Sequence, residues 1–138
     1  MPDQPFGSTP LKTTLCFNRA ENKGHYSAGI ISRGMLYVSG QLSLDPDTRE
    51  VCKGDIRDHA RQALANVDRV LQAAGCSRND VVSCHVYTPE VKYWGPINEV
   101  YAEFFGDHRP ARVVSTSNLH FGCLVEIEAV AEIPDYKE

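Results

Sequence analysis

The sequence predicts an α+β fold, in which about six strands form one mixed sheet and two helices cover one of its faces. Apolar and polar residues alternate in the strand-like segments, whereas apolar residues recur every three or four positions in the helix-like ones. These segments follow the order β-β-β-α-β-α-β-β. Helices between strands favour crossovers, and neighbouring strand-like segments at both ends favour hairpins, so we expect a mixed sheet.

Residues 15–44 are predicted to form three strands. The three segments are LCF at 15–17, HYSAGII at 25–31 and MLYVSGQLSL at 35–44, separated by Lys-Gly and Arg-Gly turn signals and ended by Asp45-Pro46-Asp47. Residues 1–14 contain several prolines and few apolar groups, which is typical of a loose tail. We therefore expect one domain over 15–138.

Residues 55–74 are predicted to be an amphipathic helix with one apolar face. Asp55 is the expected N-cap, and Gly75 provides the C-terminal stop. The apolar stripe consists of Ile56, Ala60, Ala63, Leu64, Val67, Val70, Leu71 and Ala74. One apolar face predicts that this helix covers a sheet.

A strand over 81–88 and a second helix from Gly95-Pro96 to Gly106 follow. The helix is expected to direct Ile97, Val100, Tyr101, Phe104 and Phe105 inward. Residues 111–119 and 123–133 are predicted to be the last two strands.

The last predicted strand indicates an oligomer. Val125, Ile127, Ala129, Ala131 and Ile133 alternate with Leu124, Glu126, Glu128, Val130 and Glu132, so they point to opposite faces. The first set belongs to the helix-covered core. The second set is still partly apolar, and an apolar sheet face that no helix covers predicts burial against another subunit.

Composition narrows the classes of function. The chain has 138 residues, a formal net charge of -4 and no run of Lys or Arg, which disfavours nucleic acid and membrane surfaces as partners. The N-terminal segment has no cationic and apolar secretory pattern, and no apolar stretch approaches the ~20 residues of a membrane span. We expect a soluble, cytoplasmic protein.

The cysteine and histidine pattern argues against disulfides and metals. Five scattered cysteines, an odd number without a CxxC pair, fit buried thiols in a reducing compartment. Cys84 and His85 are adjacent in a predicted strand and point to opposite faces, and no histidine pair has metal-binding helical spacing. We expect no metal. Sequence patterns for phosphate-binding loops and serine-hydrolase elbows are also absent.

Arg112 and Glu126 are the first candidate site residues. If the last two strands pair as a hairpin, the two side chains lie near each other on the second face of the sheet. A guanidinium can then hold a substrate carboxylate with two hydrogen bonds, and a carboxylate can activate water. The alternative is an ordinary cross-strand salt bridge, and spacing alone does not exclude it.

The sequence resembles the RidA/YjgF family, the reactive-intermediate (enamine/imine) deaminases, over nearly the whole chain after the tail. The matching segments are GHYS at 24–27, YVSGQ at 37–41, GD at 54–55, ANV at 65–67, LQAAG at 71–75, DVV at 80–82, INEVYAEFF at 97–105, PAR at 110–112 and VEIEA at 125–129. Many short matches in order are more specific than any one of them.

The resemblance implies a chorismate-mutase-like fold and a homotrimer whose sheets form a central barrel, with three sites in the clefts between subunits. It also implies hydrolysis of small enamines or imines, such as 2-aminoacrylate, to a 2-keto acid and ammonia, without cofactor or metal. The partner is then a small carboxylated metabolite.

By the same resemblance, Arg112 matches the arginine that holds the substrate carboxylate, and Glu126 matches the acidic residue that positions water. The substrate-binding positions are Tyr26, Ser39, Gly40, Asn98 and Val114. Tyr26 is alternatively a packing residue, Gly40 a strand bulge, and Asn98 a brace for its helix. We expect Glu126 to be ionised, with Arg112 nearby favouring that form.

The chain departs from the family pattern at three places. Val114 replaces a frequent cysteine, His25 replaces a frequent proline, and the segment Gly106-Asp107-His108-Arg109 is short and adds a second cation near the cleft. These changes point to a different substrate, such as a larger or dianionic aminomuconate.

Two other functions stay open at this stage. One is a non-catalytic trimer that binds a carboxylated metabolite or protects other proteins. The other is a nuclease or translation inhibitor, a function attached to this family, but the negative charge and the missing basic stripe argue against it.

Overall fold

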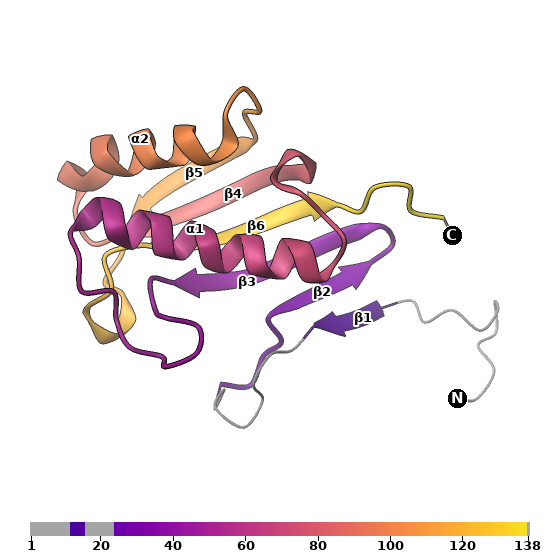
Figure 1. The fold of residues 1–138 in the computed structure, drawn as a ribbon, viewed down its shortest axis with the longest axis horizontal. Coiled ribbons are helices and arrows are strands. Elements are labelled where there is room, and N and C mark those ends of the chain that lie inside the picture. Colours follow the sequence, from indigo (N-terminus) through magenta and orange to yellow (C-terminus); the bar gives the residue numbers. More distant parts are fainter. Residues whose placement is uncertain (1–11, 16–23, 138) are drawn as a thin grey trace.

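The computed structural model describes residues 12–15 and 24–137 as a six-stranded mixed sheet with two helices on one face (Figure 1). The elements are β1 (Lys12–Leu15), β2 (Gly29–Ser32), β3 (Met35–Leu42), α1 (Ile56–Ala73), β4 (Val81–Thr88), α2 (Trp94–Phe105), β5 (Ala111–Thr116) and β6 (Glu126–Glu132). The α+β class, the number of strands and the order of elements are confirmed.

The pairing of the last two strands is not the expected hairpin. The strands lie in the order β1-β2-β3-β6-β4-β5, so β6 is inserted between β3 and β4 and does not touch β5. The β5 strand instead runs parallel to β4, and the other pairs are antiparallel. A parallel neighbour requires a crossover, which α2 supplies between β4 and β5.

The first helix forms where the sequence predicts it, because both of its ends are specified locally. The Asp55 side chain accepts a hydrogen bond from the Asp58 backbone N–H, and the Asp58 side chain accepts one from the Asp55 backbone N–H. Gly75 has a φ of 79°, a left-handed conformation that suits glycine and ends the helix. The second helix begins at Trp94, slightly before the predicted start.

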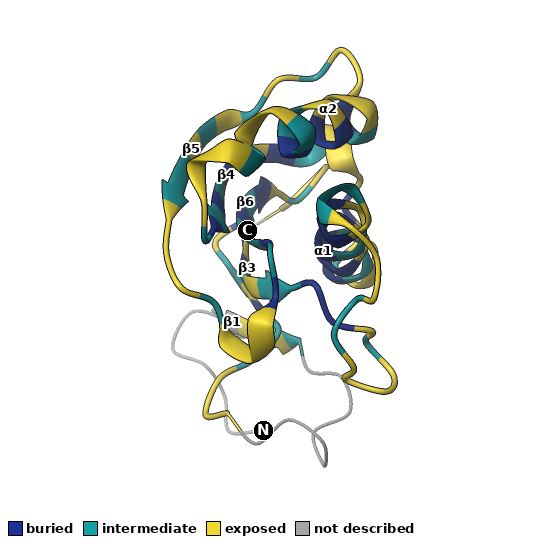
Figure 2. Ribbon diagram, turned by 90° about the vertical axis from the view of Figure 1, so that its left-hand side faces the viewer, coloured by how far each residue is buried: buried dark blue, intermediate teal, exposed yellow. Residues whose placement is uncertain are grey.

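The core lies between the sheet and the two helices, which Figure 2 shows on the same side of the strands. Leu64, Val67 and Leu71 of α1 are fully buried against this sheet face. Val125 and Ile127 are also fully buried, which confirms the predicted inward set of the last strand; Ile133 is only half-buried. Phe104, expected to point inward, is likewise only partly buried, whereas Phe105 is buried.

Neither α1 nor α2 covers the other face of the sheet (Figure 2). Tyr37 of β3 and Val113 of β5 are 50% and 55% exposed on their strands. This is the partly apolar second face that the sequence predicts.

Two predicted boundaries differ at the N-terminal end. The β1 strand begins at Lys12, inside the stretch predicted as a tail, because residues 12–15 pair with β2. Residues 1–11 of the predicted tail, and Cys16 and Phe17 of the first predicted strand, lie outside the described residues. None of the helices described for residues 24–137 combines the length and apolar character needed to cross a membrane.

Candidate active site

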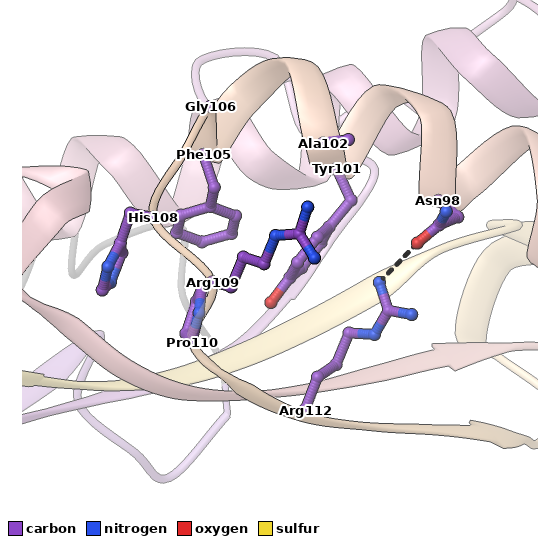
Figure 3. Close-up of a pocket in the computed structure, with 9 residues that line it drawn as sticks. All are labelled: Asn98, Tyr101, Ala102, Phe105, Gly106, His108, Arg109, Pro110 and Arg112. Atoms are coloured by element: carbon purple, nitrogen blue, oxygen red, sulfur yellow. Dashed lines mark hydrogen bonds between the residues drawn. The ribbon is translucent and has the colours of Figure 1, made fainter.

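Arg112 lies near the start of β5 and points toward α2 (Figure 3). Its Nη1 donates a hydrogen bond of 3.0 Å to Oδ1 of Asn98. The guanidinium carbon lies 4.7 Å from the ring centre of Tyr101 and 5.5 Å from that of Trp94. These contacts orient the guanidinium plane and still leave most of its five N–H groups for a ligand.

A pocket of about 480 Å³ opens beside Arg112, between the C-terminal half of α2 and the segment that leads into β5. It is lined by Asn98, Tyr101, Ala102, Phe105, Gly106, His108, Arg109, Pro110 and Arg112 (Figure 3). The charged groups among these lining residues are cationic, and no carboxylate is among them. The pocket therefore suits an anion.

Val114 and Asn98 lie on the helix side of the sheet, as Arg112 does. Val114 is half-buried and packs against the hydrophobic core on the helix side, the side toward which Arg112 also points. Asn98 does more than brace its helix, because its side chain holds the arginine that faces the pocket. We call Arg112, Asn98, Val114 and the two rings of Trp94 and Tyr101 the arginine group.

Glu126 lies in a second group, on the opposite face of the sheet. Its neighbours Val125 and Ile127 are fully buried, so alternation directs Glu126 away from the helices. The carboxylate lies over Gly40, where an added Cβ would come within 2.8 Å of Oε2. The β3–β6 register shifts between Val38 and Gln41, so Gly40 lies in an irregularity of the strand that allows this close approach.

Ser39 connects this irregularity to the segment that carries Tyr26. Its Oγ donates a 2.6 Å hydrogen bond to the Ser27 carbonyl, and its backbone N–H donates to Ala28. Tyr26 is 51% exposed, so within one chain it is not part of the packed core. We call Tyr26, Ser39, Gly40 and Glu126 the glutamate group.

The predicted proximity of Arg112 and Glu126 is wrong within one chain. Arg112 is aligned with Cys84 of β4, and Glu126 with Tyr87, on opposite sides of that strand. Two strand spacings and three residues separate them, so their Cα atoms lie on the order of 14 Å apart. Their side chains also point to opposite faces. The expectation failed because it assumed a hairpin between β5 and β6.

The electrostatic environment of Glu126 differs accordingly from the expected one. Burial raises the pKa of its carboxyl above the ordinary value; His120 lowers it in part, and the neighbouring Glu128 raises it further. Arg112 of the same chain does not contribute. Within one chain, nothing from the arginine group keeps Glu126 ionised.

Residues 17–133 match the family model described as Endoribonuclease L-PSP. The chain belongs to this family, the RidA/YjgF family. It is 47% identical over 116 residues to a RutC family protein of Pyrococcus horikoshii, covering 83% of this chain and 89% of that protein. It is 36% identical over 109 residues to the 2-iminobutanoate/2-iminopropanoate deaminase of Rattus norvegicus, covering 78% and 80%. The crystal structure of E. coli TdcF with bound serine has a TM-score of 0.76 at 34% identity, over 80% of this chain and 91% of that one.

Trp94 and Tyr101 were not predicted as site residues, either from the sequence pattern or from the resemblance to the RidA/YjgF family. The signal was present, because Trp94, Asn98 and Tyr101 follow the i, i+4, i+7 spacing of one helix face. When aromatic residues share one face of a helix and the following strand carries an arginine, the rings are expected to pack on the guanidinium of that arginine.

A polar network beside the glutamate group was also missed. The Tyr87 hydroxyl donates a hydrogen bond to Glu128, which raises the pKa of Tyr87 to about 12. The His85 ring stacks on Tyr87 at 4.0 Å and lies 2.7 Å from Ser115 Oγ. These residues order the outer face next to Glu126.

The cysteine prediction is confirmed for most of the described thiols. Cys76, Cys84 and Cys123 are buried, Cys52 is half-buried, and all four are unpaired. Burial raises the pKa of Cys76 to about 11, which keeps it a thiol at neutral pH. Cys84 and His85 indeed point to opposite faces. Within residues 12–15 and 24–137 no three His, Cys, Asp or Glu side chains converge as metal ligands would.

Proposed function

We propose that this protein hydrolyses small carboxylated enamines or imines to 2-keto acids and ammonia. The observation that carries the proposal is the Arg112 guanidinium, which lies near two aromatic rings and donates to Asn98 at the edge of a pocket lined without carboxylates. Such an arrangement can bind a substrate carboxylate with two parallel hydrogen bonds. Relatives named imine deaminases, at about 36% identity, support the same chemistry.

The reaction needs a correctly oriented substrate and water more than it needs a strong nucleophile. An enamine tautomerises to an imine, whose carbon is already electrophilic, and water then displaces ammonia. Arg112 holds the carboxylate beside this carbon, and an ionised Glu126 accepts a proton from the attacking water. The proposed mechanism uses no cofactor and no metal.

We place the complete site between two copies of the chain. Arg112 and Glu126 of one chain face opposite sides of the sheet, so one substrate cannot contact both. The homotrimer that the family resemblance implies brings the arginine group of one copy to the glutamate group of another. Exposed Tyr37, Ile30 and Val113 on the helix-free face support its burial against a second copy.

The first test measures deamination of 2-aminoacrylate. A PLP-dependent dehydratase acting on serine generates the substrate in situ, and pyruvate release competes with a trapping agent. We expect the wild type to accelerate pyruvate release, and Arg112→Ala to lose on the order of 10³-fold in kcat/KM, because about two charge-assisted hydrogen bonds disappear. Arg61→Gln, on an exposed part of α1, is the matched control and keeps wild-type activity.

The second test asks whether the two groups act from different chains. Arg112→Ala and Glu126→Gln proteins are unfolded together, mixed in equal amounts and refolded into mixed oligomers. If each site takes its arginine and its glutamate from different copies, about a quarter of the sites are intact, and about a quarter of wild-type activity returns. If one chain supplies both residues, mixing restores nothing.

The same assays separate deamination from binding alone. If the wild type binds 2-keto acids saturably in calorimetry but accelerates the hydrolysis of no imine tested, the protein is a metabolite-binding protein and not a deaminase. Acceleration restricted to larger imines would keep the reaction and change the substrate.

A further inference from the structure

We infer that Arg109 is a second anion-binding residue of the Arg112 pocket and that the substrate is a dicarboxylic 2-imino acid. This inference rests on the proposed function, because it assigns the substrate class of the same site. Arg112 would hold the carboxylate next to the imine, and Arg109 the carboxylate at the far end.

The first support is the position of Arg109. Arg109 and Arg112 both line the pocket of about 480 Å³. Figure 3 shows the two guanidinium groups on the same side of the β5 backbone, below α2, with Tyr101 beside them. The two residues are three positions apart, so their Cα atoms are at most about 10 Å apart. A short dicarboxylate can therefore reach both.

The second support is that Arg109 has no partner among the residues that the structure describes. Arg57, Arg61 and Arg78 each form an ion pair with a carboxylate. Arg109 is exposed and forms neither an ion pair nor a hydrogen bond with any residue among 12–15 and 24–137. A cation that has no partner in the described part of the chain, at a pocket lined without carboxylates, is available to a ligand.

The third support is that the segment carrying Arg109 is held in place. Gly106 ends α2 with a φ of 64°, a left-handed conformation that turns the chain toward β5. The next anchor is His108, whose Nε2 lies 2.6 Å from the Val81 carbonyl oxygen. Pro110 restricts the backbone on the other side of Arg109. Because its neighbours are anchored, Arg109 can bind a ligand at a smaller cost in conformational entropy.

The size of the pocket agrees with this substrate class. A volume of about 480 Å³ exceeds the needs of a three-carbon imino acid. Such a substrate would use Arg112 alone and leave Arg109 without a role. The additional cation therefore indicates a longer substrate that ends in a second negative charge.

The test compares substrates that differ only in the second carboxylate. Amino-acid oxidases generate 2-iminoglutarate from glutamate and 2-iminopentanoate from norvaline, with catalase present, and loss of the trapped imine reports turnover. We expect the wild type to prefer 2-iminoglutarate at least 10-fold in kcat/KM. Arg109→Gln reduces this preference at least 10-fold, because only the dicarboxylate loses a charge-assisted contact. Arg61→Gln keeps the preference.

A preference that is unchanged in Arg109→Gln, or a wild type that favours 2-iminopentanoate, overturns the inference while leaving the deaminase proposal intact. If the wild type turns over neither imine, calorimetry with 2-oxoglutarate and 2-oxopentanoate still decides the role of Arg109. Tighter binding of 2-oxoglutarate that is lost in Arg109→Gln supports it, and equal binding contradicts it. The pairs 2-oxoadipate and 2-oxohexanoate repeat the comparison at greater length.

Discussion

The arginine group and the glutamate group are built in different ways. The arginine group is local in sequence, since residues 94–114 supply all of it through α2 and β5. The glutamate group combines the segment around Tyr26 and Ser39 with β6, about a hundred residues later. The arginine group therefore depends on contacts within one short stretch of the chain, whereas the glutamate group depends on long-range strand pairing.

Each group is also held by its own helix. The second helix contacts Arg112 directly through Asn98. The first helix instead holds the backbone near Glu126: Nδ2 of Asn66 donates to the carbonyls of Leu42 and Leu44 at 2.9 and 2.8 Å. In the proposed site, substitution of Asn98 in α2 is therefore expected to affect substrate binding, and substitution of Asn66 in α1 to affect the position of the strand that supports Glu126.

Asn98→Asp is expected to give the largest effect in this comparison. A carboxylate in place of the Asn98 amide would pair with the Arg112 guanidinium and compete with the substrate, raising KM by about 100-fold. Steady-state kinetics on the preferred imine measures this. Asn79→Asp adds the same charge at an exposed position that is not among the residues lining the pocket, and an equal loss in that control would contradict the role of Asn98.

Gly40→Ala tests the glutamate group. The new Cβ would come within 2.8 Å of Glu126 Oε2, which is the end of a flexible side chain and can move away. We expect about 10- to 100-fold lower kcat, because the carboxylate is displaced, with little change in Tm. Gly95→Ala is the matched control, since no atom lies within 4 Å of its added Cβ. A large fall in Tm with unchanged kcat would make Gly40 purely structural.

The contrast between the two groups also explains what the sequence predicted. Alternation of Val125, Glu126 and Ile127 correctly placed Glu126 on the helix-free face. The face of Arg112 was not predictable in this way, because Val113 and Val114 are equally apolar and only Val114 packs on the core.

The elements were easier to predict than their pairing. Capping residues and periodicity act locally, so they specified α1 and the strand over 81–88 correctly. No local sequence feature specifies that β6 lies between β3 and β4, because this strand order depends on contacts between distant segments.

The pKa of Glu126 tests the proposal that the two groups come together from different copies. Burial raises this pKa in one chain, and Arg112 of that chain does not oppose it. If a neighbouring copy brings its Arg112 close, the pKa of Glu126 in the oligomer is lower than in Arg112→Ala, because a cation favours the carboxylate. Carbon NMR of labelled glutamate measures both. The acid limb of the pH–rate profile should move with it, since activity is lost as pH falls and Glu126 is protonated. Identical values in the two proteins would contradict the intersubunit site.

His59 of α1 is expected to make the stability of the fold depend on pH. Its Nδ1 lies 2.7 Å from Ser43 Oγ and accepts the Leu124 backbone N–H at 3.3 Å, close to the start of β6. Burial lowers the pKa of His59, while Asp58, the Cys52 carbonyl and Asp55 oppose this. The folded state then binds fewer protons than the unfolded state. The contribution of neutral His59 to stability is therefore complete above the unfolded pKa of about 6.5, and it is lost as pH falls through the lower pKa of the folded state.

His59→Asn keeps an acceptor near the position of Nδ1 and removes the titration. Denaturant unfolding between neutral and mildly acidic pH should show a smaller decrease in stability for this variant than for the wild type. Equal slopes would assign the pH dependence to other groups.

The smallest effect is expected for Tyr101→Phe. The Tyr101 hydroxyl is buried without a hydrogen-bond partner of normal geometry, and the Cys84 thiol is its polar neighbour. Removing it keeps the ring beside Arg112 and should stabilise the fold by up to about 1 kcal/mol, because an unsatisfied polar group is removed from the core. Thermal unfolding measures the gain in Tm. A clear loss of stability would show that the contact with Cys84 is favourable.

The central position of β6 has a consequence for folding. Residues 126–132 form the last of the six described strands in chain order, yet they fill the gap between β3 and β4 in the middle of the sheet. Before β6 docks, β3 and β4 each expose an edge of unpaired backbone groups. Docking of β6 therefore protects two strand edges at once, and a variant that slows it is expected to aggregate more readily during refolding.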